Sequence, residues 1–362
     1  MIGYTLGRYF FTRYLVTVGY FLVGIMAMVF VTNFTQINDR LSGVAQYNVS
    51  TGLGIAALQV PMILQQTIPF VGLFASMALL VQLNRKYELV VARSAGLSAW
   101  QFLLPIALGA LAFGIASVIV INPLAARTYL LAEEMQAPFG SKKAGASTAL
   151  SIPWLRQKSD DGEIIIGAKT VLKDGTELVS PVFMVIDAEG AVKKRIDANR
   201  AELQVKNWLL TGATTSRPGA APEHQATMNI ATNLTPELVQ ERLQIPEMTP
   251  FFALPQKIAV ARALGYQANA FAMQFHSVMA LPALLVVMTL IASTVTLKFV
   301  RFGQSGTMIL GGILAGFMLY VVTVLVKAFG KAGIVSPGLA AWFPVVVAFL
   351  FGVSFLLHKE DG

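Results

Sequence analysis

The residues that could carry chemistry are few and widely separated in this chain of 362 residues. Its three histidines, His224, His276 and His358, lie in different regions and are not spaced as a metal site or an acid–base cluster. Cysteine is absent, which excludes a disulfide framework, a thiolate zinc site and a cysteine nucleophile. The sequence contains no G-x-x-x-x-G-K-[ST] phosphate loop. It therefore predicts no catalytic site, no metal site and no directly bound cofactor.

The most informative polar stretch is 83–98, LNRKYELVVARSAGLS, which separates two long apolar regions. Charged residues flank an apolar centre, and Ala95-Gly96 closes the segment. A short amphipathic helix of this kind can dock on a partner, and its carboxylate, Glu88, would suit a basic or hydrogen-bonding pocket. A plain connection held in place by positive charges fits the same pattern. Both interpretations stay open on the residues alone.

Polar side chains within or beside the apolar regions are amides and one imidazole: Gln65, Gln66, Gln267, Gln274 and His276. Proton- and ion-driven transporters place carboxylates or lysines in their spans, and these regions contain none. Hydrogen bonding between helices is the ordinary role of buried amides. An ion-driven secondary transporter is therefore disfavoured.

The elements that must position these residues are membrane helices. Hydrophobic residues make up 55% of the chain and charged residues 13%. A span needs about 20 apolar residues. Six windows free of Asp, Glu, Lys and Arg are long enough: 14–38, 41–84, 94–126, 263–297, 302–326 and 332–358. Because the second window begins with polar residues, we expect one helix there, over roughly 56–82, bent near Pro61 or Pro69.

Charge is distributed unevenly along the chain. Of 27 Lys and Arg and 19 Asp and Glu, residues 124–266 contain 16 and 15, so this segment has the charge density of a soluble domain. The apolar parts contain 11 basic and 4 acidic residues, which favours contact with a membrane surface over nucleic acid. With both termini in the cytoplasm, eight flanking cations lie inside and three outside: Arg8, Arg13, Arg85, Lys86, Arg93, Lys298, Arg301 and Lys359 against Arg40, Lys327 and Lys331.

The middle segment has the pattern of an all-β domain. Short alternating or β-branched runs such as GEIIIGAKTVL are separated by Asp-Gly and Glu-Gly turn signals, which predicts a sandwich or a rolled sheet. TPELVQERLQ and PQKIAVARALGYQAN are predicted to be helical. We expect three segments: 1–123 with three transmembrane helices, an outer β domain over 124–266, and 267–362 with three more helices.

Three motifs carry a resemblance to a known family: NRKYELVVARSAGLS at 84–98, TNLTPEL at 232–238 and GGILAGFMLYVVTVLVKAFGKAGIVSPGLAAWFP at 311–344. With the order of three spans, a β domain and three spans, they resemble the LptF/LptG permeases of the lipopolysaccharide-export ABC transporter. The last two motifs look more like the LptG branch. The resemblance covers essentially the whole chain.

The resemblance implies a partner-dependent, non-catalytic transport subunit in a bacterial inner membrane. It implies an LptF-type permease as heterodimer partner, an LptB-type ATPase dimer that hydrolyses ATP, and LptC and LptA-type periplasmic proteins that receive lipopolysaccharide. It also implies a jellyroll-like periplasmic domain. By motif position, the coupling segment that docks on the ATPase is 83–98, and its expected coupling residues are Arg85, Glu88, Leu89, Val90, Arg93 and Gly96.

The substrate side departs from the family's pattern. In the family, basic residues at the outer end of the first helix meet the phosphates of lipid A, but here this stretch reads VTNFTQINDRLSG, where Asp39 accompanies the one cation, Arg40. Other cations near the same predicted face could take this role, which gives a candidate substrate-binding set of Arg40, Arg127, Lys327 and Lys331.

Two other classes of protein fit parts of this pattern. One is a membrane-anchored sensor or assembly scaffold whose outer sheet binds a partner. The other is a permease-like protein of lipoprotein release or cell division, which also couples to an ATPase but typically has fewer spans. Six spans and the coupling-like segment favour the glycolipid permease, and co-elution with an ATPase subunit would separate the alternatives.

Overall fold

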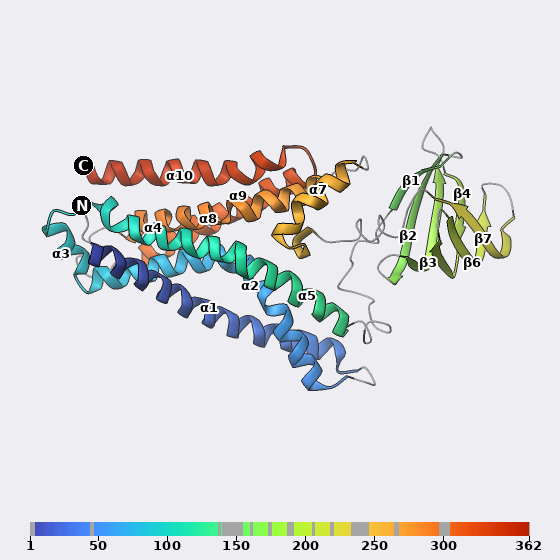
Figure 1. Ribbon diagram of the computed structural model, residues 1–362, viewed down its shortest axis with the longest axis horizontal. Coiled ribbons are helices and arrows are strands. Elements are labelled where there is room, and N and C mark those ends of the chain that lie inside the picture. Colours follow the sequence, from blue (N-terminus) through green and yellow to red (C-terminus); the bar gives the residue numbers. More distant parts are fainter. Residues whose placement is uncertain are drawn as a thin grey trace. The chain divides into compact units, whose positions relative to one another are not determined.

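The computed structural model describes residues 4–43, 47–136, 139, 155–159, 162–172, 176–186, 192–204, 207–217, 221–232, 246–263, 268–296 and 305–361. The chain forms two compact units, one of Met1–Gly140 with Pro246–Gly362 and one of Ser141–Ile245. The first is helical and the second is a β-sheet (Figure 1). The boundaries expected at 124 and 266 both fall inside the helical unit.

Six described helices are long and apolar enough to cross a membrane, which confirms the predicted six spans. The span that begins at Ala99 consists of two α-helices joined by a π-helical turn. The helical elements are α1 (Tyr4–Leu41), α2 (Val49–Arg85), α3 (Glu88–Ser94), α4 (Ala99–Ala116), η1 (Ser117–Ile121), α5 (Asn122–Gln136), η4 (Pro246–Met248), η5 (Phe251–Ala253), α7 (Leu254–Ala263), α8 (Asn269–Thr296), α9 (Ser305–Lys331) and α10 (Pro337–Asp361).

The second span begins earlier than the expected residue 56. Asn48 caps α2 by accepting a hydrogen bond from the Ser50 backbone nitrogen at 3.3 Å, so most of the predicted polar entry is helical. The helix then continues through Pro61 and Pro69. Its 37 residues give a length of about 55 Å, well beyond a hydrocarbon core of about 30 Å. Residues at its ends therefore lie outside the apolar layer.

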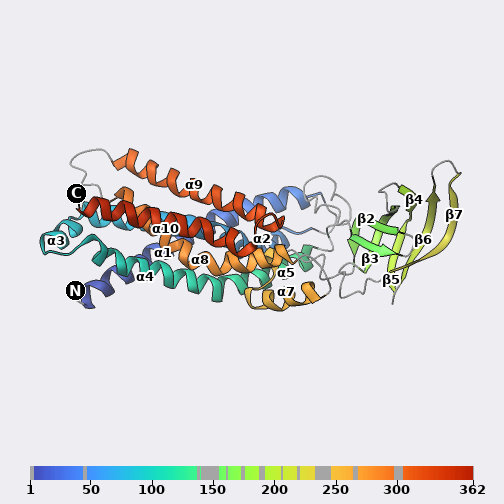
Figure 2. The ribbon, with the colours of Figure 1, turned by 90° about the horizontal axis from the view of Figure 1, so that it is seen from above.

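Helices α2 and α8 form the centre of the helical unit, and their most apolar windows are 61% and 56% buried. Small residues let the neighbouring helices approach closely. A Cβ on Gly114 of α4 would lie 2.4 Å from the Pro282 Cα of α8. Between α2 and α8, the Ser76 and Thr289 hydroxyl oxygens are 2.9 Å apart. In contrast, α9 lies along the outside of the unit (Figure 2), with 17% of its window buried.

The β unit is one antiparallel sheet, which confirms the predicted all-β insertion. Strands β4 and β5 both lie between β3 and β6, so together they act as one interrupted strand in a meander. The strands are β1 (Leu155–Ser159), β2 (Gly162–Leu172), β3 (Glu177–Ile186), β4 (Val192–Asp197), β5 (Arg200–Gln204), β6 (Asn207–Ser216) and β7 (Glu223–Ala231).

Alternation along these strands gives the sheet a single apolar face. Ile166 of β2 is paired with Phe183 of β3, and Phe183 makes an edge contact with Trp208 of β6. All three side chains are fully buried. The helix expected over TPELVQERLQ, and most of the motif at 232–238, lie outside the described residues.

Candidate functional site

The connection between α2 and α4 contains two residues in the left-handed backbone conformation, Tyr87 before α3 and Gly96 after it. After α2 ends at Arg85, Tyr87 adopts φ 59°, which reverses the chain and starts α3 at Glu88. This conformation is unfavourable for a residue with a side chain. Because Tyr87 keeps this unfavourable conformation, α3 begins at a defined point after the turn. It is therefore a defined element of structure and not a loose loop.

The end of α3 explains the AGLS pattern in the sequence. Gly96 has φ 83°, and the Leu97 backbone nitrogen donates to the Ala92 carbonyl oxygen at 3.1 Å, as in a Schellman motif. Ser98 then starts α4 with a capping box that it shares with Gln101. Glycine and serine are therefore needed here for backbone reasons, whatever docks on the segment.

The two sides of α3 differ in burial and charge. Leu89 and Ala92 are buried against the helical unit. On the outer side, Tyr87 is 70% exposed and Val91 is 65% exposed. Exposed cations with no ion-pair partner among the described residues lie in α3 or directly before it: Arg85, Lys86 and Arg93. We call these five exposed residues of α3 and of the turn before it the outer face of α3; they offer aromatic, apolar and basic groups to the surroundings.

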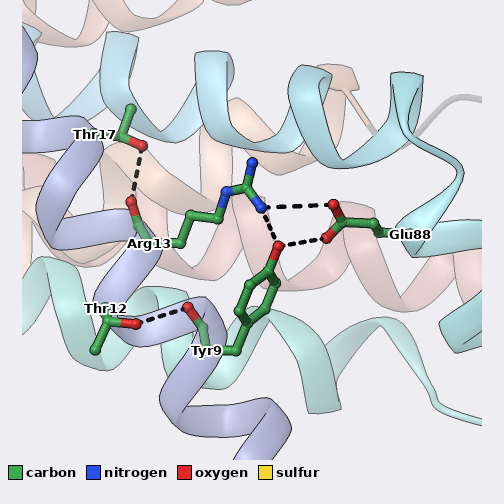
Figure 3. Close-up of polar contacts among 5 residues, drawn as sticks. All are labelled: Tyr9, Thr12, Arg13, Thr17 and Glu88. Carbon is green, nitrogen blue, oxygen red and sulfur yellow. Dashed lines mark hydrogen bonds and ion pairs between the residues drawn. The ribbon is translucent and has the colours of Figure 1, made fainter.

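Glu88 does not point to the outer face but toward α1 (Figure 3). Its carboxylate accepts a hydrogen bond from the Tyr9 hydroxyl at 3.0 Å and lies 3.6 Å from the Arg13 guanidinium. Arg13 also donates to the Tyr9 hydroxyl oxygen. Tyr9 and Arg13 are four residues apart and so share one side of α1. The three side chains, which we call the α1–α3 link, join the first span to the connection.

The structure divides the expected coupling residues into groups. Arg85, Arg93 and Gly96 are exposed, Glu88 and Val90 are half-buried, and Leu89 is buried. Leu89 therefore packs within the chain, and Tyr87 and Val91 offer the exposed apolar surface. Reasoning from sequence missed Tyr9 and Arg13, because only the fold shows that α1 passes beside α3. Their spacing of four was the one available signal.

At the other end of the helical unit, a cavity of about 460 Å³ lies among α2, α8, α9 and η4. It contains two of the expected substrate residues, Lys327 and Lys331, both near the end of α9. Lys331 forms an ion pair with Glu247 of η4, which also lines the cavity. Sequence reasoning had not singled out Glu247, since no pattern linked it to α9.

The remaining expected polar residues lie in different places. Gln65, Gln66 and Gln274, which come from two different spans, line this same cavity. Arg40 and Arg127 are exposed and do not line it. His276 is half-buried and its Nδ1 has no hydrogen-bond partner among the described residues, and Gln267 lies outside the described residues.

Six described spans, an inserted antiparallel sheet and a short structured connection between spans define a multi-pass membrane protein. The family model of the lipopolysaccharide export system permeases LptF/LptG matches residues 8–358, so the chain belongs to that family. It is similar to the lipopolysaccharide export system permease protein LptG of Haemophilus influenzae, at 24% identity over 351 residues, or 94% of this chain and 93% of that protein. The resemblance drawn from the sequence is confirmed.

Proposed function

We propose that the chain is the LptG-type permease subunit of an ABC transporter that extracts lipopolysaccharide from the inner membrane. It works with an LptF-type permease on an LptB-type ATPase dimer, which hydrolyses the ATP, and passes the lipid to LptC and LptA-type proteins. The end with α3 and both termini faces the cytoplasm (Figure 1), as the excess of flanking cations there favours. The β unit is then periplasmic.

The observation that carries this proposal is the outer face of α3. A helix of seven residues is too short to be stable alone. Here it is fixed by buried Leu89, by Tyr87 and Gly96 at its ends, and by the α1–α3 link. Its exposed residues include a tyrosine and two arginines, residue types that are enriched in protein interfaces. An exposed helix that is anchored between two spans in this way is suited to receiving force from a nucleotide-binding partner.

The α1–α3 link connects α3 mechanically to the first span. Arg13 and Tyr9 bind Glu88 from the first span, so a displacement of α3 also acts on α1. The most apolar window of α1 is just 6% buried within the chain and that of α9 is 17% buried. These two uncovered helices are the walls that we assign to the contact with the partner permease and to the lipid path between the two subunits.

Cations at the opposite end supply contacts for the anionic headgroup. Arg40, in the last turn of α1, and Arg127 of α5 are exposed, while Lys327 and Lys331 line the cavity. A cation beside a phosphate forms a charge-assisted hydrogen bond, the stronger kind in proteins. Lipid phosphates held at the rim leave the acyl chains on the apolar faces of the helices, without desolvating any charge.

Reconstitution of the complex tests the proposal. The chain is purified with and without the LptB-type ATPase and the LptF-type permease, and ATP-dependent release of lipopolysaccharide from proteoliposomes to a soluble acceptor is measured. Co-elution of all three subunits and ATP-dependent release are expected. If the chain elutes alone and binds a periplasmic protein through residues 141–245, it is a scaffold or sensor instead, and the proposal is wrong.

A further inference from the structure

Between the β unit and the span α8, the chain passes through η5 and α7, and we call residues 251–262 the return segment. Two contacts hold its start on the helical unit. The Phe251 backbone nitrogen donates to the Asn122 Oδ1 of α5 at 2.7 Å. The Phe251 ring is stacked on Phe275 of α8, with centroids 5.2 Å apart and an angle of 5° between the planes. The start of the return segment is thus fixed against two spans.

The level of these contacts along the spans places the start of the return segment at a membrane surface. At 1.5 Å per residue, Asn122 lies about 35 Å from Ala99, where its span begins, and Phe275 lies about 32 Å from Thr296, where α8 ends. Charged residues that precede Ala99 and follow Thr296 keep these two ends at the opposite surface. The hydrocarbon core is about 30 Å thick. Phe251 therefore lies where the acyl chains meet the headgroups, on the side away from α3.

The end of the return segment stays near this level. Arg262, in the last turn of α7, is close enough to His276 of α8 for an electrostatic interaction, and His276 directly follows Phe275. In Figure 2, α7 lies at one edge of the helical unit. The return segment therefore runs along the periphery of the unit, near the outer ends of its spans.

The two sides of the return segment differ in burial. Leu254 and Ala261 are buried. The opposite side is exposed and has no charged residue: it consists of Phe252, Pro255, Gln256, Ala259 and Val260. Spacings of three and four residues put these side chains roughly on one face. The largest of them, Phe252, is 63% exposed. The segment thus presents a mainly apolar face at the level of the membrane surface.

We infer that the return segment is an interfacial anchor whose exposed face packs on the phospholipid bilayer, at the boundary of acyl chains and headgroups opposite α3. The depth of the segment selects this partner, because an uncharged face with a phenylalanine at this level meets lipid. Arg262 is exposed and lies among the headgroups, where anionic lipids attract it. The anchor fixes the height at which the chain enters α8. The inference requires only that α8 spans the membrane, so it is independent of the transported lipid.

Site-directed spin labelling of the full-length chain tests this anchor in nanodiscs of phosphatidylcholine and phosphatidylglycerol. Because the sequence contains no cysteine, Phe252→Cys and Val260→Cys each provide a single attachment site. Electron paramagnetic resonance measures collisions of the label with molecular oxygen, which concentrates among acyl chains, and with nickel ethylenediaminediacetate, which stays in water. We expect frequent collisions with oxygen and few with the nickel complex at both positions.

Two further labels set the scale of this measurement. Phe343→Cys, at an exposed position of the span α10, gives the value for lipid, and Glu202→Cys, at an exposed position of β5, gives the value for water. Nickel collisions at Phe252→Cys as frequent as at Glu202→Cys would show that the face lies in water. Protection of Phe252→Cys from both reagents would show that protein covers it. Either result would overturn the inference.

A charge on the exposed face should lift the segment from the bilayer. Phe252→Asp puts a carboxylate at the acyl-chain boundary, so nickel collisions of the label at Val260→Cys should rise several-fold, whereas Phe252→Leu should leave them unchanged. Val192→Asp in β4 is the matched control, because it puts the same charge on an exposed apolar position outside the helical unit. It should not affect the label. An unchanged label in Phe252→Asp would mean that Phe252 does not hold the segment in the bilayer, and the inference would be wrong.

Discussion

The two ends of the helical unit contain similar ion pairs in different surroundings. At one end, Glu88 of the short helix α3 is bound to Arg13 of α1; at the other, Glu247 of the short helix η4 is bound to Lys331 of α9. In both cases a connecting segment is joined to a long helix that the rest of the chain leaves largely uncovered. Each pair thus links a connection to a helix with room to move.

The surroundings give the two pairs different roles. Around Glu88, the buried side chains of α3 and its two turns already fix the helix. The ion pair therefore serves mainly to couple α3 to α1. Around Glu247, a second lysine and three amides line a cavity, so this pair borders a cavity and not packed side chains. Partly exposed pairs of this kind contribute about 0–1 kcal/mol to stability. The first pair is suited to transmitting force, and the second holds η4 with fewer neighbouring contacts.

Reversing the charge at Glu88 should have the largest effect on transport. Glu88→Lys puts a cation opposite Arg13 and removes the acceptor for the Tyr9 hydroxyl, so α3 no longer moves with α1. We expect ATP-driven release of lipopolysaccharide to fall by about tenfold or more, while the stability changes by no more than about 1 kcal/mol. Release assays with the reconstituted complex and thermal unfolding measure the two quantities.

A charge exchange provides the control for this variant. Glu88→Arg combined with Arg13→Glu restores opposite charges across the link and should recover part of the release. Arg85→Ala removes one cation of the outer face and should cost less than Glu88→Lys. Full activity of Glu88→Lys, with normal assembly, would show that the link has no role in coupling.

Truncation of Leu89 should have the next largest effect, and this effect is on stability. Its side chain is 4% exposed within the chain's own core, so Leu89→Ala leaves a cavity and costs about 2–5 kcal/mol. Val91→Ala, on the outer face, should leave stability within about 0.5 kcal/mol but weaken co-elution with the ATPase. Denaturation of the purified chain and co-elution distinguish packing from docking, and equal effects of the two variants on stability would contradict the assignment of the two sides of α3.

Removal of the cations at the end of the helical unit opposite α3 should have a moderate effect, a reduced binding of lipopolysaccharide. The triple variant Arg40→Ala, Lys327→Ala and Lys331→Ala loses contacts with the anionic headgroup, and the loss should be greater at low salt than at high salt. Crosslinking to lipopolysaccharide at two salt concentrations measures this. If the triple variant crosslinks as well as the parent, these side chains only anchor helix ends at the membrane surface, and the partner permease supplies the phosphate contacts.

Sequence patterns were sufficient for the elements that are defined by composition. Windows without charge predicted the six spans, and alternation predicted the sheet, in which the run GEIIIGAKTVL forms β2. They were insufficient for the start of α2 and for contacts between segments that are distant in the sequence. Asn48 caps α2 ahead of its expected start, a helix signal that the polar residues around it obscured. The partners of Glu88 come from 75 and 79 positions away, and no local pattern contains that proximity.

Gly96→Ala should have the smallest effect on coupling. This variant tests whether the left-handed closing turn at Gly96 helps to keep α3 in place. At φ 83°, an alanine is strained by about 1–2 kcal/mol, although a Cβ there would meet no atom within 4 Å. Amides at the end of α3 should therefore exchange hydrogen several-fold faster, with a modest loss of coupling and no change in the outer face. Gly24→Ala in α1 is the matched control, because its Cβ also meets nothing but its backbone has no positive φ. There alanine should slightly stabilise the helix. Unchanged exchange in Gly96→Ala would mean that Leu89 and the α1–α3 link hold α3 without help from its closing turn.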